Sequence, residues 1–281
     1  MRRVLLLDFD GAFYQIPTNA IAHLEDRIDS AMLHLLSKRL SEASESEYRK
    51  CVDMLNEAYR TIDKSQLVPN LHNQNAGGDT VEQLPIRELE GKTFMELCQA
   101  ETAVYAARAL GKIIGQNPLV PKNHRISGMM NLGLGVTMYE IELYYRMYAT
   151  INYSDFKICP NMAMVELIRE AQKNGDVIMV WTDNSSSNVI TGLQALSSHY
   201  DSRNFIAIID QFDCGGYTKK TEHGVKNGLE VARQKLREKG IDPNNCRLEF
   251  YDDNPQVCES VTHWGVIPSF VVKSDVITAL N

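Results

Sequence analysis

Two carboxylates stand one residue apart near the start of the chain, at Asp8 and Asp10. They directly follow the apolar residues 4–7, a run typical of a buried parallel strand that ends at a polar break. Because side chains two residues apart in a strand point the same way, both carboxylates can converge on one phosphate-like group or one metal ion. A strand that merely ends in two solvated acids fits the same residues. The pair predicts a site at a strand end, where open α/β sheets bind their ligands.

A second pair of acids, Asp252 and Asp253, ends the strand expected over residues 247–251. Adjacent carboxylates repel each other unless a cation or water shields them, so a hard divalent ion is one reason for such a pair. A solvated Asp-Asp-Asn turn is the other reason. The pair is therefore a candidate metal site.

Thr182 ends the apolar run at residues 177–181 and precedes the serines at positions 185–187, which can begin a helix. A threonine hydroxyl beside the backbone N–H groups of a helix N-terminus suits a phosphate oxygen. Serine and threonine at such turns more often serve only as helix caps. Thr182 is a candidate phosphate ligand.

Three lysines, Lys219, Lys220 and Lys226, precede the helix expected over residues 228–239. An ammonium group at that place can neutralise clustered acids and a bound phosphate. For each lysine taken alone, a solvated surface position is the simpler interpretation.

The elements that must position these residues alternate between helix and strand in the C-terminal part of the chain. The expected helices span residues 162–173, 189–197 and 228–239. The expected strands span residues 177–181, 205–209, 247–251 and 266–272. This alternation predicts an α/β fold with a doubly wound parallel sheet, in which the strand before Asp8 also pairs.

Residues 15–154 have a different pattern, in which helical periodicity dominates. Apolar spacing of three and four residues predicts helices over residues 21–40, 45–63, 93–114 and 136–150. Polar connections rich in helix-breaking residues are expected at 65–91 and 118–135. We therefore predict a core formed by residues 1–14 and 155–281, with residues 15–154 as an all-helical insert.

Composition narrows the classes of function. Of the 281 residues, 44% are hydrophobic and 23% charged, which is ordinary for a soluble globular protein. The net charge of -7 argues against nucleic acid and membrane surfaces as partners, and an anionic substrate would need a cation to mediate its binding. The six cysteines lack metal or redox spacing, and the run before Asp8 is too short for a signal peptide. These features predict reduced thiols and a cytoplasmic location.

Taken in order, an Asp-x-Asp after the first strand, a threonine after a later strand, a lysine before a helix and an Asp-Asp after another strand resemble four known motifs. They are those of the haloacid dehalogenase-like (HAD) superfamily of phosphohydrolases. The resemblance covers residues 1–14 and 155–281, about half of the chain. It implies a Rossmann-like HAD core, with a large helical cap inserted between the first and second motifs.

The resemblance also implies roles for single residues. Asp8 is the nucleophile, Asp10 the general acid and base, and Thr182 a phosphate ligand. Haloalkanoic acid dehalogenases lack the second aspartate, because a halide leaves without protonation. Asp10 therefore points to phosphoryl transfer within the superfamily.

For the motif lysine we prefer Lys226, with Lys220 as the alternative, because the separation of Lys226 from the Asp-Asp motif is like that in many members. Neither lysine is followed by the proline common in part of the family. The implied Mg²⁺ ligands are the carboxylate of Asp8, the backbone carbonyl of Asp10, and the pair formed by Asp252 and Asp253.

The function implied is that of a Mg²⁺-dependent phosphatase. It would hydrolyse a small phosphorylated metabolite through an aspartyl-phosphate intermediate. A phosphomutase would share every motif. A HAD-like module without catalysis, whose insert contacts other proteins, is the alternative from another class, since a fold alone does not fix function.

Overall fold

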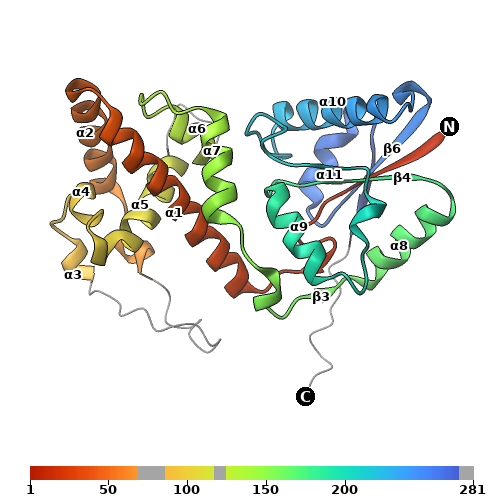
Figure 1. Cartoon of the computed structure of the whole chain (residues 1–281), viewed down its shortest axis with the longest axis horizontal. Helices are drawn as coiled ribbons and strands as arrows, with labels where there is room; N and C mark the ends of the chain where they lie inside the picture. The colour runs from red at the N-terminus through yellow and green to blue at the C-terminus, as the bar shows by residue number, and fades with distance from the viewer. Residues whose placement is uncertain (69–85, 117–124, 272–281) are drawn as a thin grey trace, which may run out of the picture. The chain divides into compact units, whose positions relative to one another are not determined.

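The computed structural model describes residues 1–68, 86–116 and 125–271, and the chain forms two compact units (Figure 1). The first unit comprises Met1–Ala20 and Ile151–Asn281, and the second comprises Ile21–Thr150. The sequence analysis places these boundaries at 14/15 and 154/155. No helix in the described ranges is long and apolar enough to cross a membrane.

The first unit is built on a five-stranded sheet with the strand order β5-β4-β1-β6-β7, in which all neighbours pair in parallel. The strands are β1 (Arg2–Leu7), β4 (Val177–Trp181), β5 (Ala207–Ile209), β6 (Cys246–Asp252) and β7 (Ile267–Phe270). The central strand is β1, and its residues 4–7 are fully buried. A strand covered on both faces has no polar side, which is why its sequence is a continuous apolar run.

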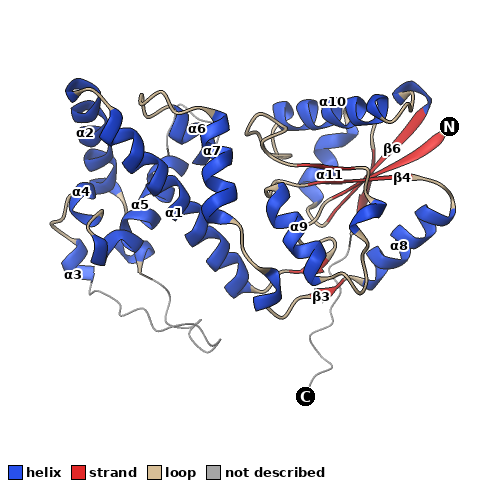
Figure 2. Cartoon of the chain, in the orientation of Figure 1, coloured by secondary structure: helices blue, strands red, loops and turns tan. Residues whose placement is uncertain are grey.

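Helices cover both faces of this sheet and alternate with its strands (Figure 2). They are α8 (Met162–Lys173), α9 (Ser186–Ala195), α10 (Glu222–Glu238) and α11 (Pro255–Thr262). On one face, α10 and α11 pack against Val4 and Leu6 of β1. Figure 1 shows α8 and α9 on the side opposite α10. The predicted doubly wound α/β fold is confirmed.

A second, two-stranded sheet was not expected from the sequence. It pairs β2 (Tyr14–Gln15) with β3 (Cys159–Pro160) in antiparallel orientation. Strands of two residues are too short to show a periodic pattern. This sheet fixes the segment that follows Asp10 against the segment that precedes α8.

The described residues of the second unit form helices and connecting turns, with no strand among them. Its helices are α1 (Thr18–Glu42), which begins in the first unit, α2 (Glu45–Thr61), α3 (Ile86–Leu89), α4 (Phe94–Leu97), α5 (Ala103–Gly115), α6 (Arg125–Met130) and α7 (Met138–Tyr144). A π-helical turn, Tyr145–Ala149, continues α7. Short 3₁₀ helices lie in this unit at Lys64–Leu67 and Ala100–Thr102. The first unit has others at Tyr153–Asp155, Ser202–Asn204 and Pro243–Asn245.

The single helix predicted over residues 93–114 is wrong. The chain forms α4 and α5 with a 3₁₀ turn between them. The Thr102 hydroxyl donates a hydrogen bond to the carbonyl of Leu97 at 2.8 Å and so satisfies an end of α4. Of the two predicted connections, 65–91 and 118–135, residues 69–85 and 118–124 lie outside the described residues.

Candidate active site

The carboxyl ends of three parallel strands meet at one edge of the sheet. Leu7 of β1 pairs with Val180 of β4 on one side and with Tyr251 of β6 on the other. This register places the residues that follow, Asp8, Thr182 and Asp252, at the same edge. The sheet thus brings together side chains that are far apart in the sequence.

A buried lysine lies among these residues. The Lys219 ammonium contacts Oδ1 of Asp8 and lies 2.8 Å from Oδ2 of Asp252. It also donates to the carbonyl of Trp181 at 3.3 Å. Only 4% of Lys219 is exposed. Burial by itself would lower the pKa of Lys219, but the charges of Asp8 and Asp252 outweigh it and raise the pKa, so the group stays an ammonium.

The structure therefore places Lys219 at the carboxylates, and the assignment of Lys226, with Lys220 as alternative, is wrong. Both of those side chains are exposed. The error came from the helix start, because α10 begins at Glu222 and not at residue 228, so that Lys226 lies within the helix. The signal for the true start is Thr221, whose hydroxyl caps the helix by accepting from the Gly224 amide at 3.0 Å.

The loop that carries Lys219 is held by neighbours on both sides. The Lys219 amide donates to Oδ1 of Asp183 at 2.8 Å, and the Ser260 hydroxyl donates to the Lys219 carbonyl at 3.2 Å. Gly224 lets the loop close onto α10, since a Cβ there would lie 1.9 Å from the carbonyl oxygen of Thr218. These contacts fix the backbone from which the lysine reaches the carboxylates.

A third carboxylate, that of Asp253, lies beside the two that contact Lys219. One oxygen each of Asp8, Asp252 and Asp253 lies within 4.8 Å of the others. Burial raises the pKa of Asp8, the Asp252 and Asp10 charges add to the rise, and Lys219 opposes it. Oxygen donors with excess negative charge are the ligands that Mg²⁺ prefers, so the donor set fits the metal that the sequence predicts.

Gly11 allows the turn after Asp10 to approach this cluster. Its φ is +87°, a left-handed conformation that glycine adopts without strain. A Cβ on Gly11 would lie 2.3 Å from Oδ2 of Asp253. The glycine is thus required both by its backbone conformation and by the neighbouring carboxylate.

Asp10 has different partners from Asp8. Its Oδ1 accepts from the Tyr14 hydroxyl at 2.5 Å, and its Oδ2 accepts from the side-chain amide of Asn184 at 3.0 Å. Burial raises the pKa of Asp10, although both hydrogen bonds act to lower it. Sequence reasoning missed Tyr14 and Asn184, because neither belongs to a motif with recognisable spacing.

Thr182 contacts Asn184, one of the two partners of Asp10, and is almost fully buried. Its hydroxyl oxygen accepts from the Asn184 amide N–H at 3.0 Å, and its own N–H donates to the carbonyl of Ile209 at 3.0 Å. A hydroxyl that accepts one hydrogen bond still has its proton to donate. Its role as a phosphate ligand stays a prediction.

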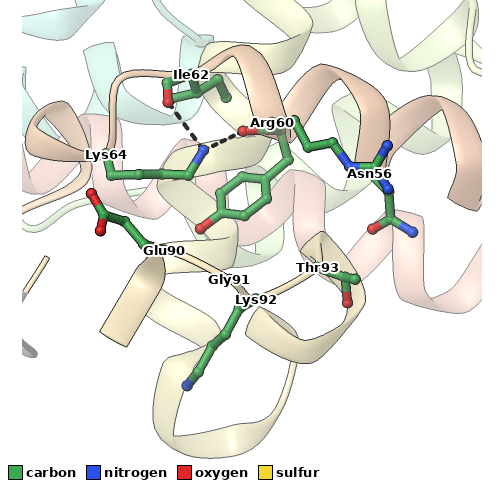
Figure 3. Close-up of a pocket in the computed structure, with 9 residues that line it drawn as sticks. Asn56, Arg60, Ile62, Lys64, Glu90, Gly91, Lys92 and Thr93 are labelled. Carbon is green, nitrogen blue, oxygen red and sulfur yellow. Dashed lines mark hydrogen bonds between the residues drawn. The ribbon is translucent and has the colours of Figure 1, made fainter. Parts of the chain in front are cut away.

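A pocket of about 450 Å³ in the second unit, beside α2 and the turn before α4, contains none of the predicted site residues (Figure 3). Its central cation, Lys64, lies 3.9 Å from the ring centre of Tyr59 and donates to the carbonyl of Ile62 at 3.0 Å. In Figure 3 the side chains of Arg60 and Lys92 point away from Lys64. Lys64 thus binds the backbone at the end of α2. The side chains of Lys64, Arg60 and Lys92 do not converge on one point.

No protein-family model and no curated protein matches the chain. Among solved structures it is similar to CbbY from Rhodobacter sphaeroides in complex with phosphate, at 15% identity and a TM-score of 0.39, over 100% of this chain and 92% of that one. It is similar to the HAD family enzyme BT-2542 from Bacteroides thetaiotaomicron, in a magnesium complex, at 9% identity and a TM-score of 0.37, over 99% and 96% of the two chains.

A third similar structure is a putative haloacid dehalogenase-like hydrolase from Bacteroides fragilis, at 14% identity and a TM-score of 0.40, over 99% of this chain and 91% of that one. Two of these three structures are thus described as members of the HAD family. At these identities and TM-scores the roles of single residues must come from the contacts at the strand ends.

Proposed function

We propose that this chain is a Mg²⁺-dependent phosphatase of the HAD-like type that hydrolyses a small phosphorylated metabolite. The observation that carries the proposal is the buried ammonium of Lys219 between the carboxylates of Asp8 and Asp252. Asp10 and Asp253 lie beside them, and all five residues meet at the carboxyl edge of the sheet.

Asp8 is the nucleophile in this proposal. Lys219 holds its Oδ1, so we assign Oδ2 to the attack on phosphorus. As the bond from Asp8 to phosphorus forms, the bond from phosphorus to the leaving oxygen breaks, which gives an aspartyl-phosphate. Water then attacks this phosphorus, which releases inorganic phosphate and restores the carboxylate.

Asp10 transfers the protons for both steps. It protonates the leaving oxygen in the first step and takes a proton from the attacking water in the second. Thr182 donates its hydroxyl proton to a phosphate oxygen. The Lys219 ammonium offsets the charge of the phosphate and of the two carboxylates that it contacts.

The residues that would hold Mg²⁺ are Asp8, Asp252 and Asp253, through their carboxylates, and Asp10 through its backbone carbonyl. When bound, the ion supplies the positive charge that lets a phosphate approach a group of carboxylates. Lys219 alone does not balance three acids, which is the reason the site needs a further cation.

A phosphate-release assay of wild type against Asp8→Asn tests the proposal. The substrates are a panel of alkyl and aryl phosphates, measured with Mg²⁺ and with EDTA. Wild type should release phosphate only with Mg²⁺, and Asp8→Asn should lower kcat/KM by on the order of 10⁴-fold. Asp201→Asn removes a carboxylate that pairs with Arg203 at the surface, and it should leave activity unchanged.

Equal rates for wild type and Asp8→Asn would exclude Asp8 as the nucleophile. Wild type that releases no phosphate from any substrate in the panel would favour the module without catalysis. Added phosphorylated acceptor distinguishes a phosphomutase, because a mutase would then transfer the phosphoryl group in preference to releasing it.

A further inference from the structure

The carboxylate of Asp10 is held at both of its oxygens by two neutral donors that come from different segments. The Tyr14 hydroxyl binds Oδ1 from β2, and the Asn184 amide binds Oδ2 from the loop between β4 and α9. We propose that Tyr14 and Asn184 are positioning residues, which hold Asp10 in the orientation that proton transfer to the leaving oxygen requires. This inference rests on the proposed function.

An aspartate carboxylate needs hydrogen bonds to fix its orientation, because rotation about its χ2 torsion is only weakly restricted. The χ2 angle of aspartate has a broad distribution with no sharp staggered minima, so packing of the Cβ leaves the carboxylate plane free to rotate. One hydrogen bond leaves rotation about that bond. Two hydrogen bonds to opposite oxygens fix the plane, and this is the arrangement that Asp10 shows.

Tyr14 is itself rigid. Its side chain is fully buried, and its ring packs 5.1 Å from that of Phe9 and 5.5 Å from that of Tyr153, at an interplanar angle of 85° in the second case. Its backbone pairs with β3 in the small sheet. The hydroxyl therefore has a fixed position relative to the turn that carries Asp10.

The direction of the Asn184 amide is fixed by its other partners. Its Oδ1 accepts from the Ser185 backbone N–H at 2.8 Å and from Nδ2 of Asn188 at 3.0 Å. A backbone N–H can only donate, so the amide nitrogen of Asn184 must be the atom that faces Asp10. That nitrogen lies 3.0 Å from Oδ2 of Asp10 and 3.3 Å from the Tyr153 hydroxyl.

The network extends one residue further. Asn188 is fully buried, and its Oδ1 accepts from the Ile151 backbone N–H at 2.9 Å. Asn184 is thus braced by a second amide side chain that is bound to the backbone. Breaking this series of hydrogen bonds would cost free energy, because each buried polar group in it would be left without a partner.

The test compares two substrates whose leaving groups differ in their need for a proton. A misoriented Asp10 should slow only the substrate that needs the proton, whereas a disturbed active site should slow both. An alkyl phosphate leaves as an alkoxide and needs a proton, whereas p-nitrophenyl phosphate leaves as a stable phenolate. The ratio kcat/KM reports the steps up to the aspartyl-phosphate, and so excludes the hydrolysis that both substrates share. The variants are Tyr14→Phe, which keeps the ring, and Asn184→Ala.

Both variants should lower kcat/KM by about 10-fold or more for the alkyl phosphate, within the roughly 10²- to 10⁴-fold that a positioned acid supplies. For p-nitrophenyl phosphate the change should stay within about twofold, since that leaving group draws little on an acid. In the background of Asp10→Asn, neither variant should add a further loss, because residues that act through one group are not additive.

Tyr200→Phe is the matched control. Tyr200 is also buried, and its hydroxyl donates to the carbonyls of Phe13 at 2.8 Å and Asn161 at 3.0 Å, away from Asp10. This variant should retain wild-type kcat/KM for both substrates. If Tyr14→Phe does not fold, Asn184→Ala alone completes the cycle with Asp10→Asn.

An equal loss on both substrates, no loss on either, or full additivity with Asp10→Asn would overturn the inference. These outcomes differ from a failure of the proposed function. If Asp8→Asn is inactive while Tyr14→Phe and Asn184→Ala behave like Tyr200→Phe, the phosphatase assignment stands and only the positioning role is lost. If Asp8→Asn is as active as wild type, the assignment itself fails.

Discussion

Each compact unit buries an aspartate beside a cation, and the two pairs differ in how their charges balance. In the first unit Lys219 lies between Asp8 and Asp252. In the second, Asp29 of α1 binds Nε of Arg125 at 2.8 Å. Asp8 is 6% exposed and Asp29 is 5% exposed, so burial does not distinguish the two.

The number of acids does distinguish them. Among the described residues Arg125 forms an ion pair with one acid, Asp29, and Gly111 packs its backbone so closely that a Cβ would lie 2.2 Å from Oδ1 of Asp29. Lys219 faces two carboxylates directly, with Asp253 within 4.8 Å of both. A balanced pair within packed helices stabilises structure, whereas an unbalanced group at strand ends attracts a cation and its ligand.

Among the changes that test this contrast between the two buried pairs, the largest effect should come from Lys219→Met, which removes the only ammonium that the described residues place between Asp8 and Asp252. We expect kcat/KM to fall by roughly 10²- to 10³-fold, as when one preorganised charge or donor is removed from a transition state. The free energy of unfolding should fall by about 3–5 kcal/mol, because two buried carboxylates lose their partner. Phosphate release and urea denaturation measure the two effects.

Lys226→Met is the control for that change, since Lys226 is exposed on α10. This variant should alter neither kcat/KM nor the free energy of unfolding. Loss of activity in Lys226→Met together with an active Lys219→Met would restore the assignment made from the sequence and would remove the contrast between the two buried pairs.

A smaller effect is expected for Gly11→Ala, which perturbs the unbalanced group without removing a charge. The new methyl group would overlap Oδ2 of Asp253. The alanine backbone would also have to adopt a left-handed conformation, which is strained for any residue with a Cβ. We expect the Mg²⁺ concentration for half-maximal activity to rise by about tenfold, because a displaced carboxylate ligand costs about 1.4 kcal/mol or more of metal binding. A Mg²⁺ titration of phosphate release measures it.

Gly175→Ala separates strain from displacement. Gly175 has a φ of +68°, and nothing lies within 4 Å of the place its Cβ would take. This variant should lose about 1–2 kcal/mol of stability, as a left-handed alanine does, with no change in its Mg²⁺ requirement. A similar Mg²⁺ shift in both variants would show that Gly11 acts only through backbone strain.

The sequence predicted well where local signals set the structure. The bounds of α8 and β4 agree with the prediction, since Asn161 caps the start of α8 and Gly175, at a positive φ, follows its end. The residues at three strand ends, Asp8, Thr182 and Asp252, were likewise predictable, because parallel strands bring their carboxyl ends to one edge.

The remaining parts of the site depend on contacts that no local pattern records. Asn184 reaches Asp10 only after the chain has returned from the insert and built the sheet. Tyr14 is close to Asp10 in the sequence, but nothing in the residue types of this segment indicates that its hydroxyl turns back onto the carboxylate. The choice of Lys219 depends on where α10 begins, and helix boundaries are the least certain feature of a periodic pattern. The Asp29–Arg125 pair joins α1 to a helix far along the chain, which sequence spacing cannot reveal.

The smallest effect on activity, and the sharpest contrast, is expected for Asp29→Asn. Burial raises the pKa of Asp29 from its ordinary 3.8 to about 7, although Arg125 opposes the rise. Between these pH values the folded chain keeps a proton that the unfolded chain has released, so the free energy of unfolding falls as the pH rises from about 4 to about 7. At about 1.36 kcal/mol per pKa unit, this loss amounts to at most about 4 kcal/mol.

The asparagine variant cannot titrate and should lack this loss, so its stability relative to wild type should rise between pH 5 and pH 8 in urea denaturation. Its kcat/KM at pH 7 should stay within about twofold of wild type, because Asp29 and its ion-pair partner Arg125 both belong to the helical unit, whereas the proposed catalytic residues belong to the other. Parallel stability curves for the two proteins would mean that Asp29 is ionised throughout this range. The pair with Arg125 would then be as strongly charged as the one at Lys219, and only the excess of acids around Lys219 would separate the two.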